Sequence, residues 1–135
     1  MGRPLLILLD THVVVWLASG DARVSRRAQA AIDQARQAVH GLAISDFTLV
    51  ELSGLFRKKQ FALTVSPEAF LSEVERRFVV LPVTANIALQ ALELPTSYPK
   101  DPADRIIGAT ALIEDLPLLT ADAAIRRTRA IPTIW

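Results

Sequence analysis

Four acidic side chains are placed where they could act together on one substrate. Asp10 and Asp122 each stand just after a short apolar run that predicts a β-strand. Asp104 lies in the first turn of an apolar helical segment, and Glu51 lies one to two turns into another. In an open parallel sheet, connecting loops and helix N-termini converge outside the carboxyl ends of the strands. We therefore expect these four acids to face one crevice.

Carboxylates that share a crevice need a positive charge between them. Two unit charges about 4 Å apart interact by roughly 4 kcal/mol at an effective dielectric near 20. No lysine or arginine adjoins all four acids in the sequence, and the chain has no cysteine. An all-oxygen ligand set selects Mg²⁺ or Mn²⁺ over zinc. One or two such ions could activate a water molecule and stabilise the leaving oxygen of a phosphodiester.

Each acid also has a purely structural interpretation. Asp10, Asp104 and Asp122 could cap or begin helices, a role worth roughly 0.5–2 kcal/mol. Glu51 fits such a role less well, because mostly apolar residues share its helical face and charged residues are rarely buried unpaired. His12 and His40 are too few and too far apart to indicate a zinc site, and His12 is expected at a helix N-terminus near the crevice.

Short strands alternate with helices along the chain. The predicted strands are 5–9, 41–44, 78–83, 117–120 and 131–135. The predicted helices are 12–18, 25–37, 45–59, 66–76, 84–92, 106–113 and 122–129, with Asp101 and Pro102 as cap and first position ahead of the sixth. Helix 45–59 is expected to be internal, because apolar residues nearly encircle it. This alternation predicts an α/β fold with a mainly parallel sheet.

Composition narrows the class of protein further. The 135 residues fit one domain, 1–135, and 51% hydrophobic with 21% charged residues excludes a disordered chain. The absence of cysteine excludes a disulfide scaffold, a thiol nucleophile and a thiolate metal site. A net charge of +1 gives no bulk attraction to polyanions. Small basic groups at 57–59 and 126–129 could instead follow a nucleic-acid backbone locally.

No membrane or export address is expected. The apolar run 5–9 is shorter than the roughly 7–15 residues of a signal core, and Asp10 ends it. No stretch reaches the roughly 20 apolar residues of a membrane span. The sequence therefore predicts a cytoplasmic protein.

Four short segments, in this order, carry a family resemblance. They are LLDTHV at 8–13, ISDFTLVEL at 44–52, DPADRIIGATA at 101–111 and LLTAD at 118–122. Together they resemble the PIN-domain family, and within it the VapC-type toxins of bacterial toxin-antitoxin pairs. No single segment is specific, but their order and spacing match over residues 5–135.

The resemblance implies a fold, an activity and partners. It implies a three-layer α/β/α sandwich and an Mg²⁺- or Mn²⁺-dependent endoribonuclease that hydrolyses RNA. It also implies a homodimer and an antitoxin protein whose C-terminal segment lies over the active-site groove.

The resemblance also implies roles for particular residues. The metal-binding and catalytic cluster would be Asp10, Glu51, Asp104 and Asp122, with Thr11 and Thr120 as polar support. Asp101 competes with Asp104, which we prefer because the family's acid directly precedes the apolar helical run. Ala121 stands where the family often carries a basic or polar residue.

Other functions remain open at this point. A catalytically idle fold that only binds RNA or a partner protein would have the same sequence features. A signalling receiver domain fits less well, because it needs adjacent acids after the first strand, where Asp10 is followed by Thr11, and a lysine after the fifth. A phosphatase of the haloacid dehalogenase type needs a second acid at the position of His12.

Overall fold

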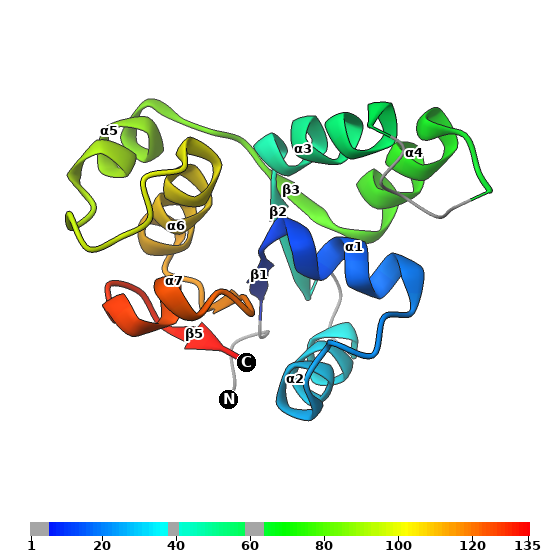
Figure 1. Ribbon diagram of the computed structural model, residues 1–135, viewed down its shortest axis with the longest axis horizontal. Helices are drawn as coiled ribbons and strands as arrows, with labels where there is room; N and C mark the ends of the chain where they lie inside the picture. Colours follow the sequence, from blue (N-terminus) through cyan, green and yellow to red (C-terminus); the bar gives the residue numbers. More distant parts are fainter. Residues whose placement is uncertain (1–5, 38–40, 59–63) are drawn as a thin grey trace.

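A parallel β-sheet forms the middle of the molecule (Figure 1). The computed structural model describes residues 6–37, 41–58 and 64–135. Within them the sheet has the order β3-β2-β1-β4-β5, and each neighbouring pair is parallel. The strands are β1 (Ile7–Leu9), β2 (Leu42–Ser45), β3 (Val79–Leu81), β4 (Leu118–Leu119) and β5 (Thr133–Ile134). The strand order reverses between β1 and β4, which is where ligand crevices form in such sheets.

Helices connect the strands. They are α1 (Thr11–Ser19), α2 (Arg26–Arg36), α3 (Asp46–Arg57), α4 (Pro67–Arg77), α5 (Ala85–Glu93), α6 (Pro102–Glu114) and α7 (Ala123–Thr128). Among the described residues, none of these helices combines the length and the apolar character needed to cross a membrane.

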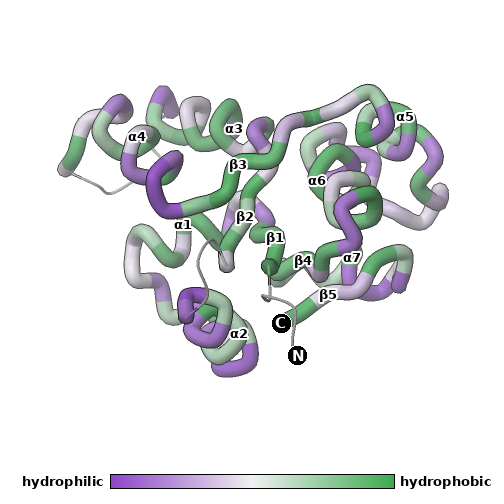
Figure 2. The backbone as a smooth tube through the Cα atoms, turned by 180° about the vertical axis from the view of Figure 1, so that it is seen from behind, coloured by the Kyte–Doolittle hydropathy of each residue, from purple (hydrophilic) through white to green (hydrophobic). Residues whose placement is uncertain are grey.

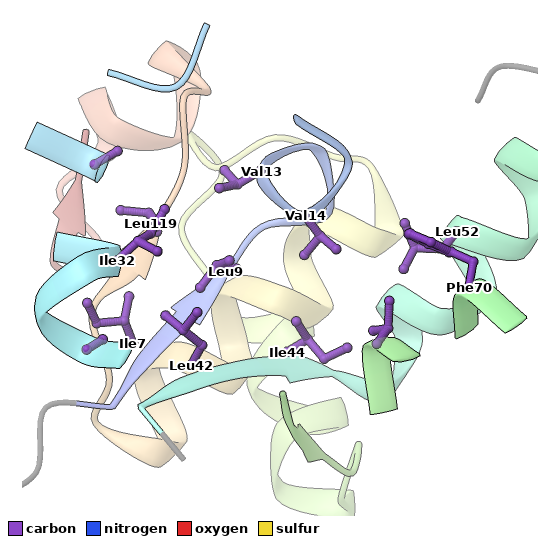
Figure 3. Close-up of a cluster of buried hydrophobic side chains, with 13 residues drawn as sticks. Ile7, Leu9, Val13, Val14, Ile32, Leu42, Ile44, Leu52, Phe70 and Leu119 are labelled. Atoms are coloured by element: carbon purple, nitrogen blue, oxygen red, sulfur yellow. The ribbon is translucent and has the colours of Figure 1, made fainter. Parts of the chain in front are cut away.

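Two buried clusters cover the two faces of the sheet. The first core cluster joins alternate strand residues such as Ile7, Leu9 and Ile44 to side chains of α1, α2, α3 and α4 (Figure 3). The second core cluster joins the intervening residue Leu8, with Leu118, to α6, α7 and the loop before α6. Because successive strand residues point to opposite faces, this alternation gives three layers. The expected α/β/α sandwich with a parallel sheet is confirmed.

Hydropathy follows these layers. Figure 2 shows the central strands in green, while purple segments alternate with paler ones along the outer helices α2 and α4. Such amphipathic helices bury one face against the sheet and leave the other in water. In α2 the buried residues are Ala28, Ile32 and Ala35, which follow the helical period.

Several helix starts have the caps that the sequence predicts. The Asp101 side chain accepts hydrogen bonds from the amides of Ala103 and Asp104, and Pro102 occupies the first turn of α6. Ser25 and Ser66 cap α2 and α4 in the same way. These caps fix where α6 begins and therefore where Asp104 stands.

Three details differ from the sequence prediction. The prediction that α3 is internal is wrong: its buried residues are Thr48 and Leu52, and Val50 is 60% exposed. All strands except β2, which keeps its predicted length, are shorter than predicted, and pairing in the outer strands extends over only two or three residues. Residues 5, 40 and 59, which belong to predicted features, lie outside the described residues.

Candidate active site

Asp10 and Thr120 meet at the carboxyl edge of the sheet. Asp10 directly follows β1 and Thr120 directly follows β4, and these two strands are parallel neighbours. The Thr120 hydroxyl donates a 2.8 Å hydrogen bond to Oδ2 of Asp10, while the amide of Thr11 donates to Oδ1 at 2.9 Å. Asp10 is 4% exposed and Thr120 is fully buried. Both oxygens of the Asp10 carboxylate are thus held in fixed positions.

Glu51 joins the same edge through Thr11. The Thr11 hydroxyl donates to Oε1 of Glu51 at 2.5 Å and lies 3.0 Å from the hydroxyl of Thr48. Burial raises the pKa of Glu51, the Thr11 hydrogen bond opposes this, and the charges of Asp10 and Asp101 raise it further. The helix α3 therefore brings Glu51 to the start of α1, beside Asp10.

Asp104 lies in the electrostatic field of the whole group. Its side chain is half buried in the first turn of α6. Burial raises the pKa of Asp104 to about 7, together with the negative charges of four other acids: Asp10, Asp101, Asp122 and Glu51. Asp10, Glu51 and Asp122 are therefore each near enough for their charges to act on Asp104, and so is Asp101.

Asp122 and Asp101 combine capping with membership of this group. Oδ1 of Asp122 accepts hydrogen bonds from the amides of Ala124 and Ile125 and so caps α7. The amide of Asp122 itself donates to the Thr120 hydroxyl at 3.1 Å. The structural and functional interpretations of these acids are therefore compatible, because a capping carboxylate keeps further lone pairs.

His12 joins the segments that follow β1 and β4. Its Nε2 accepts a 3.0 Å hydrogen bond from the amide of Ala121. In the neutral ring the proton is then on Nδ1, which lies 3.6 Å from Oδ2 of Asp10.

The acid group carries almost no compensating positive charge. Within the described part of the chain, His12 is the one basic side chain in ion-pair range of any of these acids; the other ion pairs join Arg23 to Asp21 and two arginines to Glu73. Carboxylates that form no ion pair with a lysine or arginine are an environment that a divalent cation stabilises.

The donor set fits a hydrated cation better than a closed cage. In residues 6–37, 41–58 and 64–135, no three His, Asp or Glu side chains converge tightly enough to form a ready-made ligand group. Mg²⁺ keeps several waters and is usually bound through one or two carboxylates. The all-oxygen donors and the uncompensated charge around Asp104 match that mode of binding.

Sequence reasoning missed two residues that support the site. Arg105 donates to four backbone carbonyls before α6, of which the closest are Leu94 at 2.7 Å and Ala91 at 2.8 Å. Tyr98, in the same loop, is 1% exposed. An arginine directly after an acid in an apolar helix was a usable signal for Arg105. No sequence pattern marks the burial of Tyr98.

A second concave surface lies on the face of the sheet that α1 and α4 cover. This pocket of about 530 Å³ has an apolar floor that includes Val14, Leu17 and Phe70. Arginine side chains line it as well: Arg36, Arg76 and Arg77. Its lining includes none of the four predicted site acids.

The fold and the site define a three-layer α/β protein with an acidic centre at the carboxyl edge of its sheet. A family model described as the PIN domain matches residues 7–131. The protein called Ribonuclease VapC22, from Mycobacterium tuberculosis, is 32% identical over 131 residues, which cover 96% of this chain and 98% of the relative. The chain therefore belongs to the PIN domain family.

Solved structures give the same fold. A toxin-antitoxin complex from Klebsiella pneumoniae contains a chain with 25% identity and a TM-score of 0.64, with 88% of each chain covered. A chain of DNA-bound VapBC from Salmonella typhimurium has 21% identity and a TM-score of 0.69, with 96% of each chain covered. The similarity spans nearly the whole sandwich.

Proposed function

We propose that this chain is a metal-dependent endoribonuclease and the toxin of a type II toxin-antitoxin pair. The observation that carries the proposal is the environment of Asp104, where burial and four neighbouring acids raise the carboxyl pKa to about 7. A divalent cation would relieve this repulsion, and its open coordination positions suit phosphate oxygens. Membership of the PIN domain family and the relative named Ribonuclease VapC22 support RNA as the substrate.

The four predicted acids have distinct parts in this proposal. Asp10 and Asp104 would hold Mg²⁺ or Mn²⁺, with Glu51 and Asp122 completing the negative field around it. When bound, the ion would supply an activated water and charge stabilisation. Thr120 and Thr11 orient the Asp10 carboxylate, and Thr11 also fixes Glu51.

Basic side chains on the two helices that carry Glu51 or begin at Asp122 suit an RNA backbone. Arg57 and Lys58 are exposed at the end of α3, the helix of Glu51, and Arg126 and Arg127 are exposed on α7, which Asp122 caps. None of these four pairs with an acid of the described chain. They would neutralise phosphates on either side of the cleaved bond.

The activity test uses isosteric removal of one charge. We expect Asp10→Asn and Asp104→Asn to reduce cleavage of a structured RNA by at least about 100-fold in Mg²⁺ or Mn²⁺, and chelation to abolish cleavage by the unmodified chain. Asp33→Asn, at an exposed position on α2, is the matched control and should cleave normally. Activity that resists a chelator or both substitutions would refute the assignment.

A partner antitoxin would occupy the second concave surface as well as the active-site groove. The pocket between α1 and α4 has an apolar floor, which suits an apolar segment of a partner. Arg76 and Arg77 at its edge already pair with Glu73, so Arg36 is the arginine of the lining without an ion pair in the described chain. Structures of toxin-antitoxin complexes among the neighbours support such a partner. Copurification of the two chains, and its loss in Leu17→Glu but not in the exposed Gln34→Glu, would test this surface.

Further features of the assembly belong to the same proposal. We expect residues 1–135 to act as a single nuclease domain, to form a homodimer and to work in the cytoplasm. Light scattering measures directly whether the chain forms a homodimer. A strictly monomeric toxin at micromolar concentration would contradict the homodimer.

A catalytically idle module that binds RNA or protein is the second candidate. It is favoured by the absence, among the described residues, of a ready-made group of three ligands and by the capping roles of Asp10, Asp101 and Asp122. Calorimetric titration separates the two candidates. No measurable heat with Mg²⁺ or Mn²⁺ would favour the idle module.

A further inference from the structure

The Tyr98 hydroxyl is buried without a hydrogen-bond partner. Tyr98 lies in the loop between α5 and α6, is 1% exposed and belongs to the second core cluster. Across the described residues, no other buried side-chain nitrogen or oxygen lacks a partner. A buried hydroxyl normally finds a partner, because desolvation without one costs stability. Phenylalanine would fill the same space without that cost, so the hydroxyl calls for a functional explanation.

The hydroxyl lies under the acidic centre. It packs so closely on Gly108 that a Cβ built on that residue would overlap it. Gly108 is one helical turn after Asp104 on the same face of α6. Two strand neighbours of Tyr98 in the core cluster, Leu8 and Leu118, stand two residues before Asp10 and Thr120. Side chains two apart share a face of a strand, so Asp10 and Thr120 lie on the same side of the sheet as the tyrosine ring, one step toward its carboxyl edge.

The loop that carries Tyr98 is fixed. Arg105 donates to the carbonyl oxygens of Tyr98, Pro99 and Leu94, and its guanidinium lies 6.0 Å from the centre of the Tyr98 ring. The amide of Tyr98 donates to the carbonyl of Pro95 at 2.9 Å. These contacts fix the backbone on both sides of Tyr98, while burial of the side chain, 1% exposed, keeps its hydroxyl away from water.

The Tyr98 hydroxyl stays protonated and can therefore donate a hydrogen bond. Burial raises the pKa of Tyr98, and the charges of Asp10, Asp104 and Asp122 raise it further, while Arg105 has a smaller opposing effect. The phenol therefore keeps its proton across the physiological range, and its free hydrogen-bonding capacity includes a donor.

We propose that Tyr98 is a positioning residue of the metal site, whose hydroxyl donates a hydrogen bond to an oxygen on the floor of the acidic centre when a divalent cation binds. The oxygen belongs to a carboxylate or to a water that enters with the cation, and both are acceptors that the buried phenol lacks in the present structure. This inference rests on the proposed metal-dependent function. It adds a residue that neither the acids nor their spacing indicates.

The test uses the fact that the chain has one tyrosine among its 135 residues. Tyrosine labelled with ¹³C at Cζ gives a single NMR signal, which needs no assignment and responds to hydrogen bonding of the hydroxyl. We expect this signal to shift as Mg²⁺ is added, with the same midpoint as the backbone amides of Asp10 and Asp104. The matched control is Asp104→Asn, in which the shift should be lost.

Two failures are distinguishable in this experiment. If the amides of the acidic centre respond to Mg²⁺ and the Cζ signal does not, the role of Tyr98 is overturned and the proposed function stands. If neither responds at saturating Mg²⁺ and Mn²⁺, the metal-dependent function itself fails, and the role of Tyr98 fails with it.

A variant gives a second readout. Tyr98→Phe should fold with unchanged or higher thermal stability in the absence of metal, because it removes an unpaired polar group. Its affinity for Mg²⁺, measured by calorimetry, should fall about 3- to 10-fold. Thr110→Val, which removes a buried hydroxyl bonded within α6 to Ile106, should leave the affinity unchanged. Equal affinity of Tyr98→Phe and the unmodified chain would overturn the proposal.

Discussion

The Thr120 hydroxyl donates a hydrogen bond of 2.8 Å to Asp10, across 110 positions of sequence. The hydroxyl oxygen of Thr120 also accepts a hydrogen bond of 3.1 Å from the amide of Asp122. One hydroxyl thus fixes a side chain after β1 and the backbone after β4. Because Thr120 is fully buried, water cannot replace it. Two of the candidate site acids therefore depend on one threonine for their position.

Replacement of this threonine should destabilise the chain and weaken metal binding together. Thr120→Val keeps the shape but leaves the Asp10 carboxylate and the Asp122 amide without their partner, which costs about 1–3 kcal/mol. We expect a lower denaturant midpoint and weaker Mg²⁺ binding by calorimetry. Thr110→Val, at a site 1% exposed, is the matched control and should retain normal metal affinity. Normal stability of Thr120→Val would show that the bond contributes little.

Asp104 should make stability depend on pH. The pKa of Asp104 in the folded chain is about 7, above the ordinary aspartate value of 3.8, so the folded state holds the proton more tightly between these pH values. The free energy of unfolding should therefore fall as pH rises from about 4 to about 7. The full loss of stability is present above pH 7, and none of it is present below pH 4. The half-exposed position limits this cost to about 1–2 kcal/mol.

The variant Asp104→Asn isolates this effect. It should unfold at a higher temperature than the unmodified chain at pH 8 and at the same temperature at pH 4. Thermal unfolding without metal, followed by circular dichroism at both pH values, makes the comparison. A stability difference between the two chains that does not change with pH would contradict the raised pKa.

Alanine should have opposite effects at two helical glycines. At Gly108 a Cβ would overlap the ring and hydroxyl of Tyr98, so Gly108→Ala forces α6 away from the loop and should cost at least about 1–3 kcal/mol. At Gly54, in α3, a Cβ meets nothing within 4 Å. There alanine should stabilise by about 0.5–1 kcal/mol through helix propensity. Chemical denaturation measures both, and equal effects would contradict the packing of Tyr98 on Gly108.

Arg105 should act through the loop rather than through RNA. Arg105→Met keeps the stem of the side chain but loses the hydrogen bonds to Ala91, Leu94, Tyr98 and Pro99. We expect amides 94–101 to exchange with deuterium at least about tenfold faster, because local opening becomes less costly. Exposed Arg127→Met should leave this exchange unchanged. Unchanged protection in Arg105→Met would show that the loop is held by its apolar contacts alone.

Much of the fold could be predicted because its signals are local. The unalternating run that contains Ile7–Leu9 indicated a strand buried on both faces, and Asp101 with Pro102 indicated the start of α6. The placement of Asp10 after a strand and Asp104 in a first turn followed from the same patterns. Parallel pairing then placed these acids at one edge, because the carboxyl ends of parallel strands lie together.

The supporting contacts could not be predicted, because they depend on how distant surfaces pack. The hydrogen bonds of Thr11 to Glu51 and of His12 to Ala121 join residues 40 and 109 positions apart. The expectation that α3 is internal was wrong because apolar residues around a helix do not determine how many of its faces the rest of the chain covers. Val50 remains on the surface for this reason.

The strand order has a consequence for biosynthesis. β1 is made first, but one of its two neighbours in the sheet is β4, at residues 118–119. Until the ribosome has released that segment from its exit tunnel, a nascent chain has no partner for the open side of β1 and no support for the Asp10 carboxylate. If the chain acts as proposed, a fragment that stops before β4 lacks the Thr120 hydroxyl that holds Asp10 and should not cleave RNA.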